Sequence, residues 1–260
     1  MNCKICNHGM ARAFQAKVLR KHDVSYFHCV NCGLLQTEEP YWLEEAYGSA
    51  IADADTGLVQ RNLYLSKILS TILYFAFDRD GKYLDVAGGY GMLTRLMRDT
   101  GFDFYWSDKY CENVLARGFE AEPGAAFTAM TAFEVMEHVP DPLGFVTECM
   151  AQSGSRTLIF STELFEGAPP KPEEWWYYTF ETGQHITFYQ RRSLQAIAQK
   201  LGLHCYSNGL VHAFSDRKIN GMVYRLLSSP VFARVLSLAP KFSMQSKTMT
   251  DHLDMIGRHR

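Results

Sequence analysis

The glycine-rich stretch at residues 83–91 constrains the fold of this chain more than any other feature. It reads Tyr-Leu-Asp-Val-Ala-Gly-Gly-Tyr-Gly, a short apolar run followed by a turn, and a helical pattern begins at Met92. Glycine has no Cβ, so a ligand can approach the backbone closely, and the N-terminus of a following helix presents unpaired N–H groups. The stretch therefore predicts a strand, a turn and a helix that together bind a nucleotide cofactor.

Acidic residues occupy two positions that suit such a cofactor. Asp85 lies at the end of the predicted strand, and a second apolar run at residues 102–106 leads to Asp108. In sheets that bind nucleotides, a carboxylate about twenty residues beyond the turn accepts hydrogen bonds from the ribose hydroxyls. We expect Asp108 to take that role.

A third segment, residues 133–142, reads Phe-Glu-Val-Met-Glu-His-Val-Pro-Asp-Pro, and with it the ordered motifs resemble the class I S-adenosylmethionine-dependent methyltransferases. The resemblance covers residues 80–214 and departs from the family pattern at Ala87, where glycine is usual. It implies an α/β, Rossmann-like fold with a mostly parallel, seven-stranded sheet flanked by helices. It also implies that S-adenosylmethionine contacts Asp85, Ala87, Gly88, Gly89, Gly91, Asp108, Lys109, Phe133 and Glu134.

A dinucleotide-binding dehydrogenase is the competing interpretation of the glycine turn. Its fingerprint is Gly-x-Gly-x-x-Gly, and Thr94 stands where the third glycine would be. The methyltransferase interpretation is therefore favoured.

Composition is that of an ordinary globular protein. The 260 residues are 47% hydrophobic and 21% charged, and the formal net charge is −2. Such a charge excludes the global basic field that drives nonspecific nucleic-acid binding. The longest apolar run, residues 68–77, is too short to span a bilayer, and no signal-like segment opens the chain. We predict a cytoplasmic protein without a membrane span.

Four of the seven cysteines form two Cys-x-x-Cys pairs, Cys3 with Cys6 and Cys29 with Cys32. Two such turns can direct four thiolates at one tetrahedral Zn²⁺, which would be structural because four protein ligands leave no open position. His8 and His28 are possible substitute ligands. A redox or disulfide role and uninvolved thiols are the alternatives, but the pairing favours zinc.

Changes in composition divide the chain into four predicted parts. Residues 1–36 form a zinc-ribbon-like segment, 37–80 a helical linker that covers the cofactor, 81–214 the methyltransferase core and 215–260 a C-terminal helical extension. The extension could dock on the core or form a homodimer contact. Within the core, a proline-rich loop at residues 167–172 leads into four aromatic residues at 175–178, and we predict a substrate lid there.

His185 is the first candidate for catalysis. Methyl transfer from a sulfonium is an in-line displacement, so the enzyme mainly has to align the acceptor and remove its proton. His185 follows the predicted lid, where the resembling family often places an active-site histidine, and imidazole suits proton abstraction near neutral pH. The alternative is a lid histidine with a structural hydrogen bond.

Glu134, Glu137 and His138 form the second candidate group. Their i, i+3, i+4 spacing gathers the three side chains on one side of the turn after a strand. The arrangement resembles metal-dependent methyltransferases of small-RNA 3′ ends and quinone precursors, which implies a possible Mg²⁺ site. The alternative is a Glu–His hydrogen-bond network that shapes the cofactor pocket.

The leading functional hypothesis is methylation of a small molecule. The four cysteines and the His185 segment resemble a bacterial subgroup that includes sugar methyltransferases, which implies a sugar, nucleotide-sugar or glycan acceptor. The alternatives are a metal-assisted RNA 2′-O-methyltransferase, with the cysteine segment as an RNA grip, and a noncatalytic module that binds the cofactor and assembles with partners.

Overall fold

The computed structural model describes residues 1–48 and 55–258, and these residues fall into two compact units. The first consists of Met1–Ala52, Phe133–Cys149 and Ile159–Asp216, and the second of Asp53–Ala132, Met150–Leu158 and Arg217–Arg260. The four-part division made from the sequence stays a prediction.

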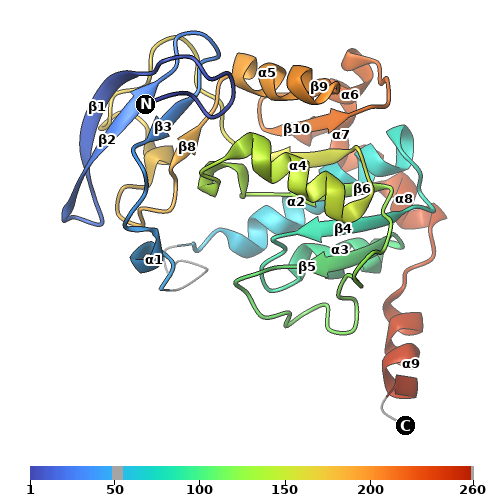
Figure 1. Cartoon of the computed structure of the whole chain (residues 1–260). Helices are drawn as coiled ribbons and strands as arrows, with labels where there is room; N and C mark the ends of the chain where they lie inside the picture. Colours follow the sequence, from blue (N-terminus) through green and yellow to red (C-terminus); the bar gives the residue numbers. More distant parts are fainter. Residues whose placement is uncertain (49–54, 259–260) are drawn as a thin grey trace. The chain divides into compact units, whose positions relative to one another are not determined.

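The N-terminal sheet belongs to the first unit. It has the strand order β1-β2-β3-β8, formed by β1 (Ala11–Val18), β2 (His22–His28), β3 (Leu35–Thr37) and β8 (Thr187–Phe188). Each neighbouring pair is antiparallel, so β8 joins a sheet whose other strands lie 150 residues earlier in the chain (Figure 1). A short helix, α1 (Leu43–Ala46), follows the third strand.

An aromatic core fills this unit behind the sheet. The 3₁₀ turn η2 (Trp176–Tyr178) contributes Tyr177 and Tyr178, which are 3% and 1% exposed. They pack with Tyr26, Trp42 and Phe188. Of the four aromatics predicted to line a lid, these two are buried, whereas Trp176 is exposed. Burial of apolar area explains why they lie inside, since each large ring removes more than 100 Å² of surface from water.

The main sheet has the strand order β5-β4-β6-β7-β10-β9. These strands are β4 (Lys82–Val86), β5 (Asp103–Ser107), β6 (Ala129–Ala132), β7 (Leu158–Ser161), β9 (His204–Ser207) and β10 (Val211–Ser215). β4 is parallel to both β5 and β6, and β9 is antiparallel to β10. The predicted α/β sheet is confirmed as a mixed sheet.

The seventh strand predicted from the resemblance is not confirmed, because this sheet has six strands over residues 1–48 and 55–258. At the edge of β5, Glu120 forms a single parallel bridge with Trp106. Two backbone hydrogen bonds flank it, from Trp106 to Phe119 and from Ala121 to Trp106, both at 2.8 Å. The segment between Asp108 and β6 contains too few consecutive apolar residues to extend this bridge into a strand.

Four helices accompany this sheet, and one of them begins at Met92, where the sequence predicts a helix. They are α2 (Leu58–Ala76), α3 (Met92–Thr100), α4 (Pro142–Ser153) and α5 (Arg191–Leu201). Ser193 lies inside the first turn of α5, where its hydroxyl accepts a hydrogen bond from the Gln190 N–H at 3.1 Å. This contact satisfies a backbone donor at the helix start.

The predicted C-terminal helical extension consists of four short helices over residues 221–258. These are α6 (Gly221–Leu227), α7 (Pro230–Leu236), α8 (Leu238–Ser243) and α9 (Thr248–Arg258). Pro230 starts α7 because its missing N–H needs no partner in a first turn. In the described part of the chain no single helix is long and apolar enough to cross a membrane. Gly221–Leu227 and Pro230–Ser243 reach that length and composition only together, and they bend by 73°.

A buried ion pair attaches α9 to α3. The guanidinium of Arg98 donates two hydrogen bonds to the Asp251 carboxylate, at 2.7 and 2.8 Å, and a third to Asp103 at 2.9 Å. Arg98 and Asp251 are both about 5% exposed or less. Burial opposes ionisation of Asp251, but the hydrogen bonds and charge of Arg98 outweigh it and lower the pKa of the carboxyl.

Replacing Asp251 by Ala is expected to lower the free energy of unfolding by about 3–5 kcal/mol, because Arg98 would keep a buried charge without its bidentate partner. Urea unfolding followed by circular dichroism measures the loss. His252→Ala, an exposed neighbour on the same helix, is the matched control and should change stability by less than about 0.5 kcal/mol. Equal stabilities of the two variants would contradict the role of this pair.

Candidate functional site

The glycine turn after β4 has the backbone that its sequence requires. Gly89 and Gly91 have φ of 54° and 83°, in the left-handed region that glycine adopts without strain. A Cβ on Gly88 would lie 2.8 Å from both the Asp85 carboxylate and the Trp106 ring. The turn therefore accepts no side chain at Gly88, and α3 begins directly after Gly91.

Ala87, the departure from the family pattern, has a φ of 53°. A left-handed alanine costs roughly 1 kcal/mol relative to glycine, and Ala87 is exposed, so its methyl group meets no obstacle. The turn keeps the glycine-type conformation even though this position is not glycine.

Asp108 closes the turn from the end of β5. One carboxylate oxygen accepts a hydrogen bond from the Gly89 N–H at 2.9 Å, and the other accepts from the N–H groups of Tyr110 and Cys111 at 2.7 and 2.8 Å. The Trp106 indole donates to the Gly89 carbonyl at 2.8 Å. Both the N–H and the carbonyl of Gly89 are thus hydrogen-bonded, and Asp108 lies beside the turn as the sequence predicts.

Asp85 is buried beneath the turn and is 2% exposed. Its two oxygens accept hydrogen bonds from the hydroxyls of Thr131 at 2.7 Å and Thr94 at 3.3 Å. Burial, together with the charge of Asp108, raises its pKa to about 7, against the favourable effect of the two hydroxyls. Asp85 therefore links β4, β6 and α3 from below.

Because its pKa is raised, Asp85 lowers the free energy of unfolding by an amount that depends on pH. Between about pH 4 and pH 7 the unfolded chain loses this proton and the folded chain keeps it, so the free energy of unfolding falls as pH rises. At about 1.4 kcal/mol per pKa unit, the effect reaches about 4 kcal/mol. Asp85→Asn keeps the acceptor for Thr131 and removes the ionisation.

We expect Asp85→Asn to gain stability relative to the unchanged protein as pH rises from 4 to 7.5, as measured by urea unfolding at each pH. Asp80→Asn, an exposed substitution of the same type, is the control and should show a pH-independent difference. A pH-independent difference for Asp85→Asn would show that the carboxyl is ionised in the folded protein over the whole range.

A second group of side chains gathers in the first unit. The ligand-type atoms of Glu137, His138 and His185 all lie within 4.8 Å of one another, although His185 is 47 residues further along the chain. The His138 and His185 rings meet edge to face with centroids 4.8 Å apart, and the Tyr47 ring lies 6.3 Å from His138. The sequence grouped Glu134, Glu137 and His138 and treated His185 separately, whereas the structure brings Glu137, His138 and His185 together.

Backbone carbonyls set the proton positions on both histidines. His138 Nδ1 lies 3.1 Å from the Gln184 oxygen, and His185 Nδ1 lies 2.7 Å from the Tyr177 oxygen. A carbonyl can only accept a hydrogen bond, so each Nδ1 carries the proton. In a neutral ring, Nε2 is then the atom that can accept a proton or bind a cation.

Glu137 has the most unusual environment in this group. It is fully buried, and in the described chain neither carboxylate oxygen has a partner at hydrogen-bond geometry, although the hydroxyls of Tyr177 and Thr162 lie near enough to favour its ionised form. Burial and then the charge of Glu134 raise its pKa well above 4.5. Burial and then the charge of His185 lower the pKa of His138 to about 3. Burial therefore disfavours the charged forms of both Glu137 and His138.

The other predicted site residues lie at the ends of β5 and β6. Glu134 accepts a hydrogen bond from the Ser161 hydroxyl at 2.6 Å and has a left-handed φ of 56°, and it is not a member of the Glu137 group. Phe133 directly follows β6 and is half-buried, and Lys109 is exposed beside Tyr110. Neither has a contact that identifies a ligand.

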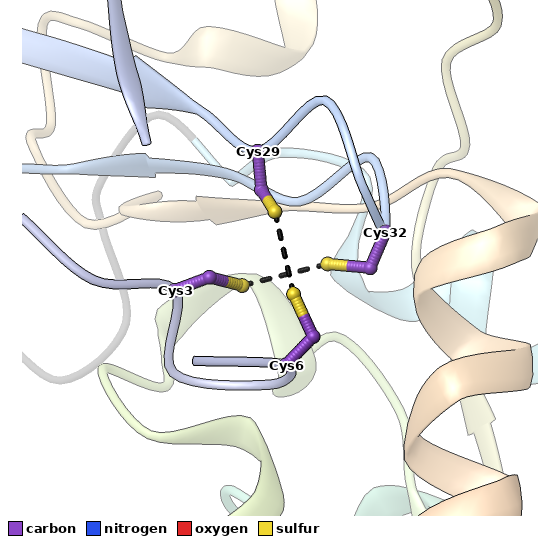
Figure 2. Close-up of side chains that lie close together, drawn as sticks. All are labelled: Cys3, Cys6, Cys29 and Cys32. Carbon is purple, nitrogen blue, oxygen red and sulfur yellow. Dashed lines mark hydrogen bonds between the residues drawn. The ribbon is translucent and has the colours of Figure 1, made fainter. Parts of the chain in front are cut away.

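The four N-terminal cysteines converge as Figure 2 shows. The Sγ atoms of Cys3 and Cys32 are 3.4 Å apart, as are those of Cys6 and Cys29. A tetrahedral zinc site with Zn–S bonds of about 2.3 Å would place its sulfurs about 3.8 Å apart, whereas a disulfide would require about 2 Å. The cluster thus has nearly the dimensions of a four-thiolate metal site and far exceeds disulfide distance.

Left-handed residues shape both cysteine turns. Asn7 follows Cys6 with a φ of 60°, and Gly33 follows Cys32 with a φ of 79°. Each residue reverses the chain so that both thiols of its pair point inward. The metal-site group of the described chain includes neither His8 nor His28, the substitutes considered from the sequence.

Several residues of these sites carry no sequence signal. Trp106 holds Gly89, and the Asn113 amide packs against the backbone position of Gly91. Tyr177 orients His185 through its carbonyl, so its side-chain type is irrelevant to that contact. Among them, only Trp106 has a position in the sequence that could have indicated its contact with Gly89, because it lies one residue before the end of the strand next to the turn.

Comparisons with solved structures find matches of low similarity. TnmH is 17% identical, with 68% of this chain and 62% of that chain covered and a TM-score of 0.48. The magnesium protoporphyrin IX methyltransferase of Synechocystis PCC 6803 is 13% identical, with 66% and 90% covered and a TM-score of 0.43. CalO1, a methyltransferase in calicheamicin biosynthesis, is 12% identical, with 67% and 61% covered and a TM-score of 0.44.

The present chain spans about three fifths of the length of TnmH and of CalO1. No curated protein matches its sequence significantly. A family model described as a methyltransferase domain matches residues 59–208, a segment that begins in α2, contains the glycine turn and Asp108, and ends after β9. Because that match covers more than half of the 260 residues, this chain belongs to the methyltransferase-domain family of enzymes.

Proposed function

We propose that this protein transfers the methyl group of S-adenosylmethionine to a small molecule, namely a sugar, a nucleotide sugar or a glycan. The observation that carries the proposal is the glycine turn, which combines left-handed Gly89 and Gly91 with a carboxylate at the end of β5 inside the matched domain. The acceptor class rests on the near-neutral charge of the chain and on the resemblance to sugar methyltransferases.

The cofactor would lie over the turn and the start of α3. The N–H groups of that helix start and the backbone from Ala87 to Gly91 supply donors at close range, because Gly88, Gly89 and Gly91 add no side chains. Phe133, Glu134 and Lys109 would contact the adenosine part. Asp85 would act indirectly, since it is buried and its oxygens hold Thr131 and Thr94.

Asp108 would accept hydrogen bonds from the ribose hydroxyls. A carboxylate offers about four lone-pair directions, and Asp108 already uses three of them on backbone N–H groups. A bidentate grip on the ribose therefore requires it to release at least one, and the single bond from Gly89 is the simplest to replace. Cofactor binding would then be coupled to a small movement of the turn.

His185 would remove the proton of the acceptor. Its Nδ1–H donates to the Tyr177 carbonyl, so Nε2 is the atom that would accept the proton, and burial lowers the pKa of the neighbouring His138. The bound cofactor supplies an electrophilic methyl group. As the base, the His185 imidazole needs only to accept one proton while the acceptor forms its bond to the methyl group.

A divalent ion at Glu137, His138 and His185 is a second candidate for activating the acceptor. The observation in its favour is the fully buried Glu137 carboxyl, which has no hydrogen-bond partner at proper geometry in residues 1–48 and 55–258. Two imidazoles and one carboxylate suit Zn²⁺, Mn²⁺ or Fe²⁺, whereas Mg²⁺ prefers oxygen ligands. The donor set therefore does not fit the Mg²⁺ considered from the sequence.

The cysteine cluster would hold a structural Zn²⁺ through Cys3, Cys6, Cys29 and Cys32. The thiols of Cys3 and Cys32, and those of Cys6 and Cys29, have nearly the separations of a four-thiolate site, and four protein ligands leave no position for a substrate. Its work would be to stabilise an N-terminal segment that is too small for a large core of its own.

The proposal is tested by calorimetric titration of the purified protein with S-adenosylmethionine and S-adenosylhomocysteine. Saturable binding is expected, and Asp108→Asn should weaken it at least tenfold, because charge-assisted hydrogen bonds contribute about 1.5–3 kcal/mol each. Asp80→Asn, which is exposed, should leave affinity unchanged. A protein that is folded by circular dichroism and binds neither compound would overturn the proposal and favour the noncatalytic module.

The acceptor class needs a separate assay. The purified protein is incubated with S-adenosylmethionine that carries a labelled methyl group. One sample contains nucleotide sugars as acceptors, and the other contains short RNA at low salt. Transfer to nucleotide sugars is the expected result. Transfer to RNA alone, lost with rising salt, would select the RNA methyltransferase alternative.

A further inference from the structure

Residues 217–250, here called the basic apolar segment, concentrate positive charge in a chain with slightly more acids than bases. The segment contains no Asp or Glu. Its six cations are Arg217, Lys218, Arg225, Arg234, Lys241 and Lys247. All of them are exposed except Lys247, which is half-buried. The segment therefore carries a formal charge of about +6 on a protein whose net charge is −2.

The helices of this segment are attached by one side only. Tyr224 and Leu227 of α6 and Ala233 of α7 are buried, and both helices contact α2 in the second unit. On the remaining sides large apolar side chains are exposed. They are Met222 (78%), Val223, Leu226, Val231 (69%), Phe232, Val235 (67%), Leu238 and Phe242 (81%).

The density of these side chains is unusual for an ordinary surface. Single exposed apolar residues need no explanation, but large apolar patches mark interaction sites. Here eight of them fall within 21 consecutive residues and alternate with Arg225, Arg234 and Lys241. Apolar side chains interspersed with cations are typical of helices that lie in the plane of a membrane surface.

The geometry of these helices fits an orientation in the plane of the membrane surface better than a membrane-spanning one. Gly221–Leu227 and Pro230–Ser243 have the combined length and composition of a membrane helix, yet they bend by 73° at the break and carry exposed cations. A bent pair in the interface can place Phe232 and Phe242 among acyl chains while the cations remain at the lipid headgroups.

A second copy of this chain is the other occupant to weigh. A two-fold contact would place two basic apolar segments, each with six cations and no acid, against one another. Like charges at such a contact repel, whereas an anionic bilayer attracts each cation near its surface. Charge complementarity thus favours lipid.

We propose that the basic apolar segment binds this protein to the surface of an anionic lipid bilayer. The proposal does not depend on the methyl acceptor or on cofactor binding.

Flotation of the full-length protein with vesicles tests it. Vesicles of equal parts phosphatidylglycerol and phosphatidylcholine should carry the protein with them, and pure phosphatidylcholine vesicles should carry much less. Phe232→Glu/Phe242→Glu should reduce the bound fraction at least tenfold. The matched control, Val30→Glu/Tyr41→Glu, adds the same charge at two exposed apolar residues of the first unit and should bind as before.

The contribution of charge is measured separately. Arg225→Gln/Arg234→Gln/Lys241→Gln should weaken binding to the anionic vesicles several-fold, and raising salt to 1 M should have a similar effect, because the screening length falls to about 3 Å. Circular dichroism and urea unfolding verify that every variant is folded.

Two results would overturn the proposal. One is a folded protein that stays with the aqueous fraction at low salt. The other is equal binding by the Phe232→Glu/Phe242→Glu and control variants. Light scattering on the same samples measures the oligomeric state. A dimer that dissociates in Phe232→Glu/Phe242→Glu, in a protein that binds no vesicles, would assign the surface to a second copy instead.

Discussion

Cys29→Ser protein is expected to contain no stoichiometric zinc and to have lost the stable structure of its N-terminal segment. Structural zinc sites in small peptides contribute about 10–16 kcal/mol of apparent binding free energy, as much as the whole stability of an ordinary domain. The Cys29 side chain is fully buried and faces Cys6, so serine offers a weaker ligand in the same place. Elemental analysis and limited proteolysis measure the two losses.

The effect should extend beyond the cysteine turns. The Ser193 hydroxyl donates to the Cys32 carbonyl at 2.9 Å, and Arg192 donates to the Val30 carbonyl at 2.8 Å, so the start of α5 is bound to the second cysteine turn. Hydrogen exchange should therefore accelerate in α5 as well as in β1 and β2.

Cys111→Ser is the matched control, because Cys111 lies outside the cluster and is half-buried. It should retain one zinc per chain and its resistance to protease. If the unchanged protein, purified without chelators, holds no zinc and still resists protease, the cysteines are not a metal site and the segment is stable through its aromatic core alone.

His185→Asn protein is expected to bind S-adenosylmethionine normally and to transfer methyl groups about 10²- to 10⁴-fold more slowly, the usual contribution of a general base. Asparagine is chosen because its side-chain N–H₂ can replace Nδ1 as the donor to the Tyr177 carbonyl, while nothing replaces Nε2. The substitution thus removes the lone pair and keeps the structural hydrogen bond. Single-turnover kinetics and calorimetry measure the two effects.

The matched substitution is His185→Ala, which removes both functions. A histidine with only a structural role would give a nearly active Asn variant and a weak Ala variant, so activity retained by Asn would exclude proton transfer at Nε2. The metal content of the same samples distinguishes a base from a metal ligand. If the His185 variants lose a stoichiometric divalent ion other than the zinc of the cysteine cluster, His185 is a ligand of that ion.

Local sequence patterns predicted most of the secondary structure because their signals are short-range. The strand at β4, the glycine turn and α3 follow one another within residues 82–100, and glycine positions there report directly on left-handed backbone. The cysteine spacing likewise predicted a cluster that the fold assembles.

Predictions that depended on long-range contacts succeeded less well. The seventh strand was inferred from a resemblance, and the segment after Asp108 supplies only the Glu120 bridge. The aromatic run at residues 175–178 was assigned to a lid by its position after prolines, but burial in the first unit determines where Tyr177 and Tyr178 lie.

The sequence by itself determined the family, the glycine turn and the pairing of the cysteines, because each depends on residue types at fixed short spacings. Only the tertiary structure decided that Asp85 supports the turn through Thr94 and Thr131, and that His185 joins Glu137 and His138. It also decided which side of the basic apolar segment is covered. The physical reason is that burial and hydrogen-bond partners depend on distant segments, and these quantities, unlike spacing, set the pKa and the chemistry of a side chain.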